Sequence, residues 1–96
     1  MKNELLIRKR AEGHIRDIFE WYEKQRPGLG TEFVVSIEAV FSRIQRDPLH
    51  FQKRYKNIRC ATLQRFPYGV FYFTDDDRVI VLAVFHFKRN IRQLKR

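Results

Sequence analysis

The chain has 96 residues, a length that allows one hydrophobic core but not two, so we expect a single domain over residues 1–96. Its 20 Lys and Arg residues outnumber its 11 Asp and Glu residues, and the formal net charge of +9 favours an anionic partner, although surplus basic residues also simply keep small domains soluble. The lone cysteine, Cys60, excludes an intramolecular disulfide and a cysteine-rich zinc site.

The N-terminal half predicts one strand and two helices. Residues 4–8, ELLIR, are short and apolar enough for a buried strand, although their two leucines would also suit a helix. Residues 11–26 carry apolar side chains at helical spacing, and the Pro-Gly dipeptide that follows ends this helix. A second helix is predicted over residues 30–47, with an apolar face formed by Phe33, Ile37, Val40, Phe41 and Ile44. The short loop between them predicts an antiparallel helical hairpin.

The C-terminal half changes to the period of a strand. Residues 49–57, LHFQKRYKN, lack a period and are predicted to form a basic loop. Three later segments are rich in β-branched and aromatic residues and predict strands, over residues 58–65, 68–74 and 78–87. Pro67 separates the first two, and the DDD tripeptide forms the turn between the last two. The order β-α-α-β-β-β predicts an α+β domain in which an antiparallel sheet packs against the helical hairpin, followed by a flexible end at 91–96.

Four segments in this order resemble the RelE/ParE superfamily of toxins from bacterial type II toxin–antitoxin pairs. They are the first-helix pattern A…DI…WYE, the interhelical turn RPGLG…F, the hairpin LQRFPYGVFY, and the last strand VIVLAVFHFKR. The resemblance covers nearly the whole chain. It implies a strand, two helices and a three-stranded antiparallel meander, which agrees with the order predicted from periodicity.

The resemblance also implies a partner and two possible targets. The partner is a small acidic antitoxin, whose negative charge suits a chain of net charge +9. The targets divide the superfamily, because toxins like RelE cut mRNA on the ribosome whereas toxins like ParE inhibit DNA gyrase. Of these, we expect a ribosome-dependent mRNA endonuclease. The alternatives are a gyrase inhibitor and a degenerate toxin that retains only antitoxin binding.

His86 is the first candidate for a catalytic residue. Cleavage of RNA by its own 2′-OH needs a base, an acid and cations near the phosphorane, and the unperturbed pKa of histidine, about 6.5, suits the first two roles. His86 stands where the last strand ends, with Lys88 and Arg89 directly after it. It also shares a strand face with Leu82 and Val84, so the alternative is a hydrogen-bonded histidine at the edge of the core.

Arginines and lysines are the candidates for contact with phosphate or with a protein target. Arg59 and Arg65 share one parity on the predicted strand, so both side chains should leave the same face and clamp a phosphate, unless they are solvated edge charges. Five further basic residues are predicted to bind substrate or target: Lys53, Arg54, Lys56, Lys88 and Arg89. His14 and His50 are expected to be structural or exposed.

Two positions set limits on the nuclease hypothesis. Nuclease-type relatives usually offer a tyrosine near the end of the domain, whereas Phe87 stands here and a phenyl ring cannot exchange a proton. Tyr68 and Tyr72 are expected to pack with a hydroxyl at the rim of the core. The gyrase-inhibiting branch commonly has an acidic residue after its last-strand arginine, where this chain has Asn90.

No cofactor or metal is expected, because the three histidines show no ligand spacing. The apolar residues Leu5 to Ile7 are too few for a signal peptide or a membrane span. Together with the lone cysteine, this predicts a cytoplasmic protein without a membrane partner.

Overall fold

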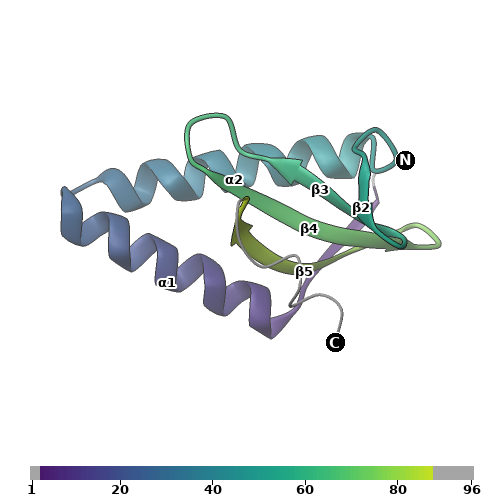
Figure 1. Ribbon diagram of the computed structural model, residues 1–96, viewed down its shortest axis with the longest axis horizontal. Helices are drawn as coiled ribbons and strands as arrows, with labels where there is room; N and C mark the ends of the chain where they lie inside the picture. The colour runs from purple at the N-terminus through teal and green to yellow at the C-terminus, as the bar shows by residue number, and fades with distance from the viewer. Residues whose placement is uncertain (1–2, 88–96) are drawn as a thin grey trace.

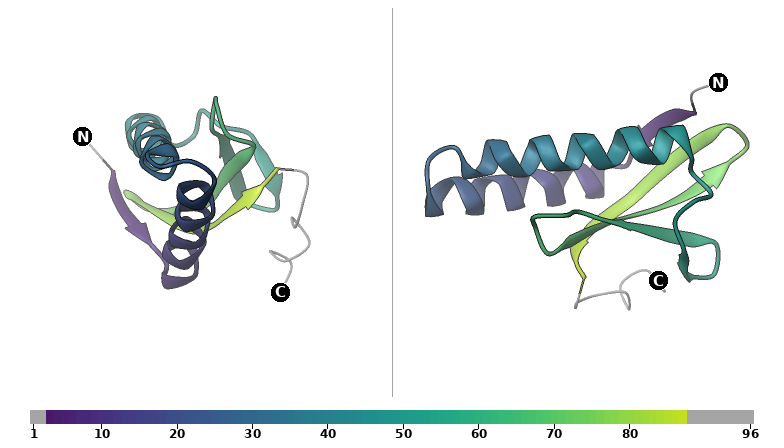
Figure 2. Two further views of the ribbon diagram at one scale, coloured as in Figure 1. Left: turned by 90° about the vertical axis from the view of Figure 1, so that its left-hand side faces the viewer. Right: turned by 90° about the horizontal axis from the view of Figure 1, so that it is seen from above.

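The computed structural model describes residues 3–87 and contains two helices and five strands. In chain order they are β1 (Glu4–Ile7), α1 (Lys9–Gln25), α2 (Leu29–Arg46), β2 (Lys53–Tyr55), β3 (Ile58–Thr62), β4 (Tyr68–Asp75) and β5 (Arg78–His86). The two helices lie side by side and cover one face of the sheet (Figures 1 and 2). The predicted α+β architecture is therefore confirmed. The predicted flexible end at 91–96 lies outside the described residues, as do Lys88, Arg89 and Asn90.

The five strands form one mixed sheet in the order β1-β5-β4-β3-β2. The predicted three-stranded meander, β3 to β5, is antiparallel as expected and is extended by β2. However, β1 pairs in parallel with β5, from Glu4 opposite Arg78 to Ile7 opposite Val81. The helical hairpin carries the chain across the sheet between β1 and the meander, so β1 can join the outer edge of β5 without a tight turn. The element order alone did not specify this parallel pair.

The segment predicted as a basic loop contains a strand. Residues 53–55 form β2, which pairs with β3 and ends at a tight turn where Lys56 has a φ of 51°. The prediction of a loop over residues 49–57 is wrong at these three residues, because a strand this short and this exposed shows no alternation. The turn predicted at DDD is confirmed, with Asp76 at a φ of 56° and Arg78 paired to Asp75 at 2.8 Å.

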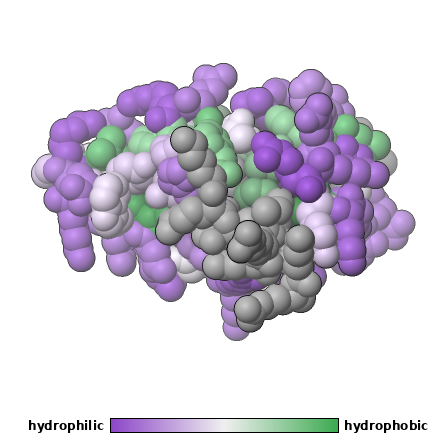
Figure 3. Space-filling view, viewed as in Figure 1, coloured by the Kyte–Doolittle hydropathy of each residue, from purple (hydrophilic) through white to green (hydrophobic). Residues whose placement is uncertain are grey.

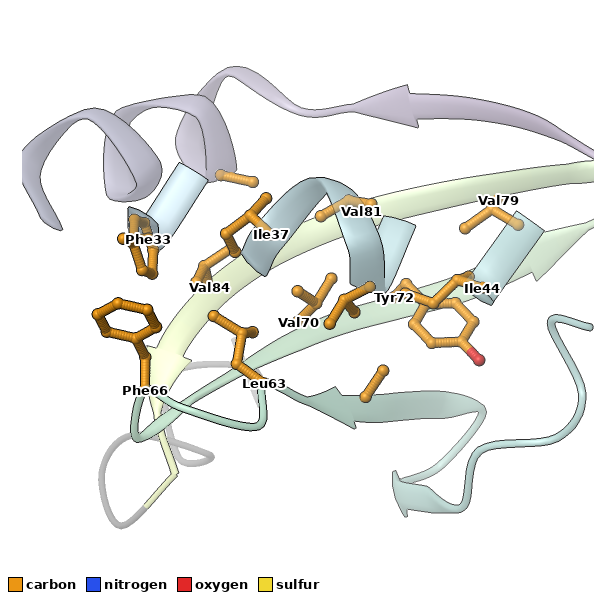
Figure 4. Packing of buried hydrophobic residues seen from close by; sticks show 13 residues of the cluster. Phe33, Ile37, Ile44, Leu63, Phe66, Val70, Tyr72, Val79, Val81 and Val84 are labelled. Atoms are coloured by element: carbon orange, nitrogen blue, oxygen red, sulfur yellow. The ribbon is translucent and has the colours of Figure 1, made fainter. Parts of the chain in front are cut away.

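The main core lies between the helices and the sheet (Figure 4). The apolar face predicted for α2 is confirmed, since Phe33, Ile37, Val40 and Ile44 are at most 2% exposed and Phe41 is partly buried. They pack on side chains of the sheet that face the helices, including Val70 and Tyr72 of β4 and Val79, Val81 and Val84 of β5. Each of these side chains contributes on the order of 1.5–3 kcal/mol by its burial.

A second cluster lies on the other face of the sheet. Its buried members are Ile58, Cys60, Phe71, Ala83 and Phe85, which alternate along their strands with members of the main core. The central strands are therefore apolar on both faces, which explains why the long run in β5 lacks a polar face.

The interhelical turn is closed by one carboxylate. Glu23, near the end of α1, accepts hydrogen bonds from the backbone N–H groups of Gly28 and Gly30, both at 2.9 Å. These are donors at the start of α2 that have no partner within the helix. A Cβ atom at Gly30 would lie 2.7 Å from the backbone carbonyl oxygen of Phe19, so glycine lets the two helices approach closely. This contact fixes how α2 lies beside α1.

Candidate functional site

His86 lies at the end of β5, on the face of the sheet that carries the helices. Its cross-strand partner is Tyr68 at the start of β4, and the two ring centroids lie 5.6 Å apart in an edge-to-face arrangement. The His86 side chain is partly buried, and the next residue, Phe87, is 41% exposed. The sequence correctly placed His86 at a strand end beside the core, where it is reachable from solvent.

Aromatic side chains from both helices and from β5 surround Tyr68. Tyr22 of α1 lies 6.3 Å from the Tyr68 ring and 5.0 Å from Phe66, which in turn packs 5.5 Å from Phe33 of α2. Burial, and then the neighbouring Tyr68 hydroxyl, raise the pKa of Tyr22, so its hydroxyl stays protonated. We call Tyr22, Phe33, Phe66, Tyr68 and His86 the aromatic cluster.

Tyr22 could not be assigned to this site from the sequence. Its helical spacing marks it as a core residue, and it is one of the partly buried residues packed against the core. No local sequence pattern indicates that a residue of α1 lies beside the start of β4 and the end of β5, because that proximity depends on how the helices lie on the sheet. An apolar face that contains a tyrosine was the only signal present in the sequence.

Arg65 lies in the loop between β3 and β4, next to the aromatic cluster. Its guanidinium lies 5.8 Å from the centre of the Phe66 ring and donates a hydrogen bond of 2.8 Å to Glu32 at the start of α2. Glu32 also pairs with Arg26 at 3.4 Å. The hydrogen bond from Arg65 is the largest cause that lowers the pKa of Glu32, and the Arg65 side chain remains 68% exposed.

Arg59 lies at the opposite end of β3 and has a different role. Its guanidinium donates to the carbonyl oxygens of Phe51 at 2.7 Å and Leu49 at 3.3 Å, so it holds the connection from α2 to β2. Arg59 pairs with Tyr72, four residues along β4 from Tyr68, the partner of His86. At roughly 3.3 Å per residue, that separation is about 13 Å along the strand.

The predicted placement of Arg59 and Arg65 on one face of the same strand is therefore wrong. β3 ends at Thr62, so Arg65 belongs to a loop and the shared parity has no meaning there. His86 and Arg65 lie at one end of the sheet, whereas Arg59 lies at the other.

Tyr72, like Arg59, stabilises the connection between α2 and β2. Its ring is fully buried, and its hydroxyl donates a hydrogen bond to the carbonyl oxygen of Pro48. Burial raises the pKa of Tyr72 to about 12, although the nearby Arg59 opposes the shift. This hydroxyl is a structural anchor, and Tyr68 is the tyrosine whose ring contacts His86.

The three basic residues predicted from the central segment lie on the β2–β3 hairpin at the edge of the sheet. Lys53, Arg54 and Lys56 are all exposed, and the Lys56 ammonium lies 5.3 Å from the centre of the Tyr55 ring. The hairpin adjoins the end of the sheet that holds Arg59. It is thus a separate basic surface, available to an anionic partner.

His14 acts as a structural residue, as expected. Its Nδ1 atom accepts a hydrogen bond of 3.1 Å from the backbone N–H of Val84, and its ring lies 5.0 Å from Phe85. β1 pairs with β5 only as far as Val81, so His14 covers the edge of β5 beyond the last paired residue. Burial, and then the charge of Arg10, lower the pKa of His14, which keeps the ring neutral as an acceptor.

The comparisons with known proteins agree with this architecture. Residues 5–91 match the family model of the ParE toxin of the type II toxin–antitoxin system parDE. Among solved structures, the chromosomal ParDE system of P. aeruginosa aligns with a TM-score of 0.77 at 17% identity, over 88% of this chain and 96% of that one. The toxin–antitoxin complex RelBE2 from Mycobacterium tuberculosis aligns with a TM-score of 0.64 at 17% identity, over 90% and 99%. No curated protein sequence matches.

The fold and the family match define a toxin of a type II toxin–antitoxin system. The chain belongs to the ParE toxin family, within the RelE/ParE superfamily that its sequence resembles. Both structural relatives are toxin–antitoxin systems, which supports an antitoxin as the partner of this chain. Over residues 3–87, neither helix is long and apolar enough to cross a membrane.

Proposed function

We propose that this toxin arrests bacterial growth by binding DNA gyrase, and that it does not cut RNA. The observation that carries the proposal is the division of the predicted catalytic residues between two ends of the sheet. Arg59 holds the carbonyl oxygens of Leu49 and Phe51, about 13 Å along the sheet from His86, so it does not neutralise a phosphate there. The match to the ParE family model over residues 5–91 supports the same choice of target.

The residue after the last strand also favours binding over catalysis. Phe87 is 41% exposed and offers an apolar surface where a nuclease of this superfamily usually offers a hydroxyl. Exposed aromatic side chains contribute strongly to protein interfaces. Phe87, followed in the chain by Lys88 and Arg89, is suited to contact a folded protein partner, and we assign these three residues to the gyrase contact.

Ribosome-dependent mRNA cleavage is the second candidate, because of the contact between His86 and Tyr68. An imidazole at the end of a strand can accept a proton from a ribose 2′-OH, and Arg65 at the same end of the sheet carries a positive charge. For Arg65 to bind phosphate, its hydrogen bond to Glu32 would first have to break. Inhibition of gyrase by binding does not require this hydrogen bond to break.

Two purified assays separate the candidates. Gyrase supercoiling of relaxed plasmid should fall with added toxin, while a reconstituted ribosomal system should translate at its normal rate with intact mRNA. The reverse pair of results, with mRNA cut at the ribosomal A site, would establish the nuclease. A chain that inhibits neither supercoiling nor translation and does not arrest bacterial growth, yet binds its antitoxin, is a degenerate toxin.

A further inference from the structure

Basic residues gather at the end of the sheet opposite to His86. Between residues 43 and 59 the chain has six Lys and Arg residues but a single acidic residue, Asp47, so this stretch carries a net charge of +5. The six are Arg43, Arg46, Lys53, Arg54, Lys56 and Arg59. More than half of the formal net charge of +9 therefore comes from the last turn of α2, the connection after it and the β2–β3 hairpin.

Phe51 holds these segments in one frame. The Arg43 guanidinium lies 5.4 Å from the centre of the Phe51 ring, and the His50 ring packs edge-on against it at 5.0 Å. Arg59 donates a hydrogen bond of 2.7 Å to the carbonyl oxygen of Phe51 and pairs across the hairpin with Lys53. These contacts join the end of α2 to β2 and β3, so the charges of the hairpin and of the helix end form one surface.

Four cations on this frame are exposed: Arg46, Lys53, Arg54 and Lys56. Over residues 3–87, none of these four forms an ion pair with a carboxylate. The acidic turn at 75–77 also lies at this end of the sheet, but it connects β4 to β5, and the right-hand view of Figure 2 shows it apart from the hairpin. Its first member, Asp75, pairs with Arg78. The four cations therefore remain available to an anionic partner.

The exposed side chains of the hairpin are basic or carry amides. Five of the residues from 52 to 57 are exposed: Gln52, Lys53, Arg54, Lys56 and Asn57. Leu49 is the one exposed large apolar residue between positions 43 and 59. Figure 3 shows hydrophilic side chains over the end of the molecule where β2 lies. Protein interfaces depend on apolar or aromatic anchors, whereas contacts to a nucleic-acid backbone come mainly from Lys, Arg and polar side chains, so this surface suits phosphates better than a folded protein.

We propose that Arg46, Lys53, Arg54 and Lys56 bind the phosphate backbone of duplex DNA while the toxin is bound to gyrase. Phe87 lies at the other end of β5, so one toxin molecule can contact gyrase through one end of its sheet and the DNA of gyrase through the other. The choice of duplex DNA over RNA rests on gyrase as the proposed target. The contact with phosphate itself follows from the charges and can be measured without gyrase.

A triple variant that combines Lys53→Gln, Arg54→Gln and Lys56→Gln tests the proposal. Its binding to a fluorescein-labelled duplex of about 30 base pairs is measured by anisotropy between about 50 and 200 mM salt. Each phosphate contact contributes about 0.9 to the slope of log affinity against log salt, so the slope should become shallower by about 2–3 than in the wild type. Affinity at the lowest salt should fall by at least about tenfold.

The matched control combines Lys9→Gln, Arg16→Gln and Lys24→Gln on α1. It removes three exposed charges, and therefore has the same net charge as the hairpin variant, but leaves the hairpin intact. It should keep the salt slope of the wild type to within about one unit. Circular dichroism should show the same fold for both triple variants.

Four results would overturn the proposal. Equal losses of DNA affinity in the two triple variants would mean that total charge attracts DNA. Tighter hairpin-dependent binding to single-stranded RNA of the same length would exclude duplex DNA as the preferred ligand. Weaker binding of the hairpin variant to gyrase without DNA would make the hairpin a protein contact. Finally, the hairpin variant should inhibit supercoiling only at a concentration at least about tenfold higher, and unchanged inhibition would show that the DNA contact is not used.

The anisotropy measurement also separates this proposal from the proposed target. A wild-type toxin that binds the duplex through its hairpin but leaves supercoiling normal would refute gyrase as the target and support the phosphate contact. A wild-type toxin that inhibits gyrase but does not bind the duplex at low salt would refute the DNA contact alone.

Discussion

His86 and Tyr68 face each other across the β4–β5 pair, with ring centroids 5.6 Å apart and ring planes at 76°. The contact joins the last residue of β5 to the aromatic cluster, which reaches back through Tyr22 to α1. An imidazole in this position can pack against the edge of the core, exchange a proton with a substrate, or do both. The two roles differ in what is lost when the ring is removed.

His86→Ala should lower stability and leave gyrase inhibition intact. The truncation removes a partly buried ring packed against Tyr68, and such a change costs on the order of 1–3 kcal/mol of unfolding free energy. Urea denaturation measures this loss, and supercoiling assays give the inhibition per folded molecule. If the toxin instead cuts mRNA with His86 as its acid or base, the same variant should lose cleavage by about two to four powers of ten.

Arg59→Ala should lower stability much more than Arg65→Ala does. Arg59 satisfies two carbonyl oxygens in the α2–β2 connection, and a hydrogen bond to a charged group contributes about 1.5–3 kcal/mol, so its loss should lower the urea midpoint clearly. Arg65 forms an exposed ion pair with Glu32, so its loss should hardly change the midpoint. Equal urea midpoints for the two variants would contradict the structural role assigned to Arg59.

The Cys60 thiol should be nearly unreactive in the native protein. It is 7% exposed on the sheet face opposite the helices, and burial raises its pKa to about 11 against a partial opposing effect from Arg54. Because the thiolate is the reactive form, alkylation by iodoacetamide at pH 8 should be far slower than in urea. Mass spectrometry after timed quenching measures both rates. Rapid native alkylation would mean that the sheet opens at β3.

The helices, the meander and the position of His86 could be predicted from the sequence because each depends on local pattern. The apolar residues of α2 recur at helical spacing, and β5 is a long apolar run that ends at the histidine. The three-residue β2 escaped prediction because it has no room for a period. The parallel pairing of β1 depends on the packing of the whole domain.

The candidate site was harder to predict because it depends on register. Tyr68 faces His86 only because the β4–β5 ladder shifts by one residue between Phe71 and Tyr72, and no sequence pattern indicates that bulge. Arg59 and Arg65 were paired by counting residues along a strand that ends three residues before Arg65. The carbonyl oxygens that hold Arg59 come from Leu49 and Phe51, which the sequence assigned to a loop without defined partners.

His14 should make stability depend on pH below neutrality. Its folded pKa lies below the ordinary value of 6.5, so between these two values the unfolded chain binds more protons than the folded one. Stability is therefore lost as the pH falls through 6.5 towards the folded pKa, with a limiting slope for one group of about 1.4 kcal/mol per pH unit. Protonation of Nδ1 also removes the acceptor of the Val84 N–H, which opens the edge of β5.

Urea denaturation of His14→Gln between pH 5 and 7.5 checks this account. Glutamine does not titrate and its carbonyl oxygen can still accept from Val84, so the slope of unfolding free energy with pH should become shallower than in the wild type. His50→Gln is the matched control, because His50 is exposed, packs edge-on against Phe51 and does not cover a strand edge. It should keep the wild-type slope. An unchanged slope in His14→Gln would show that the pH dependence arises elsewhere and that the bond from Val84 to His14 does not control it.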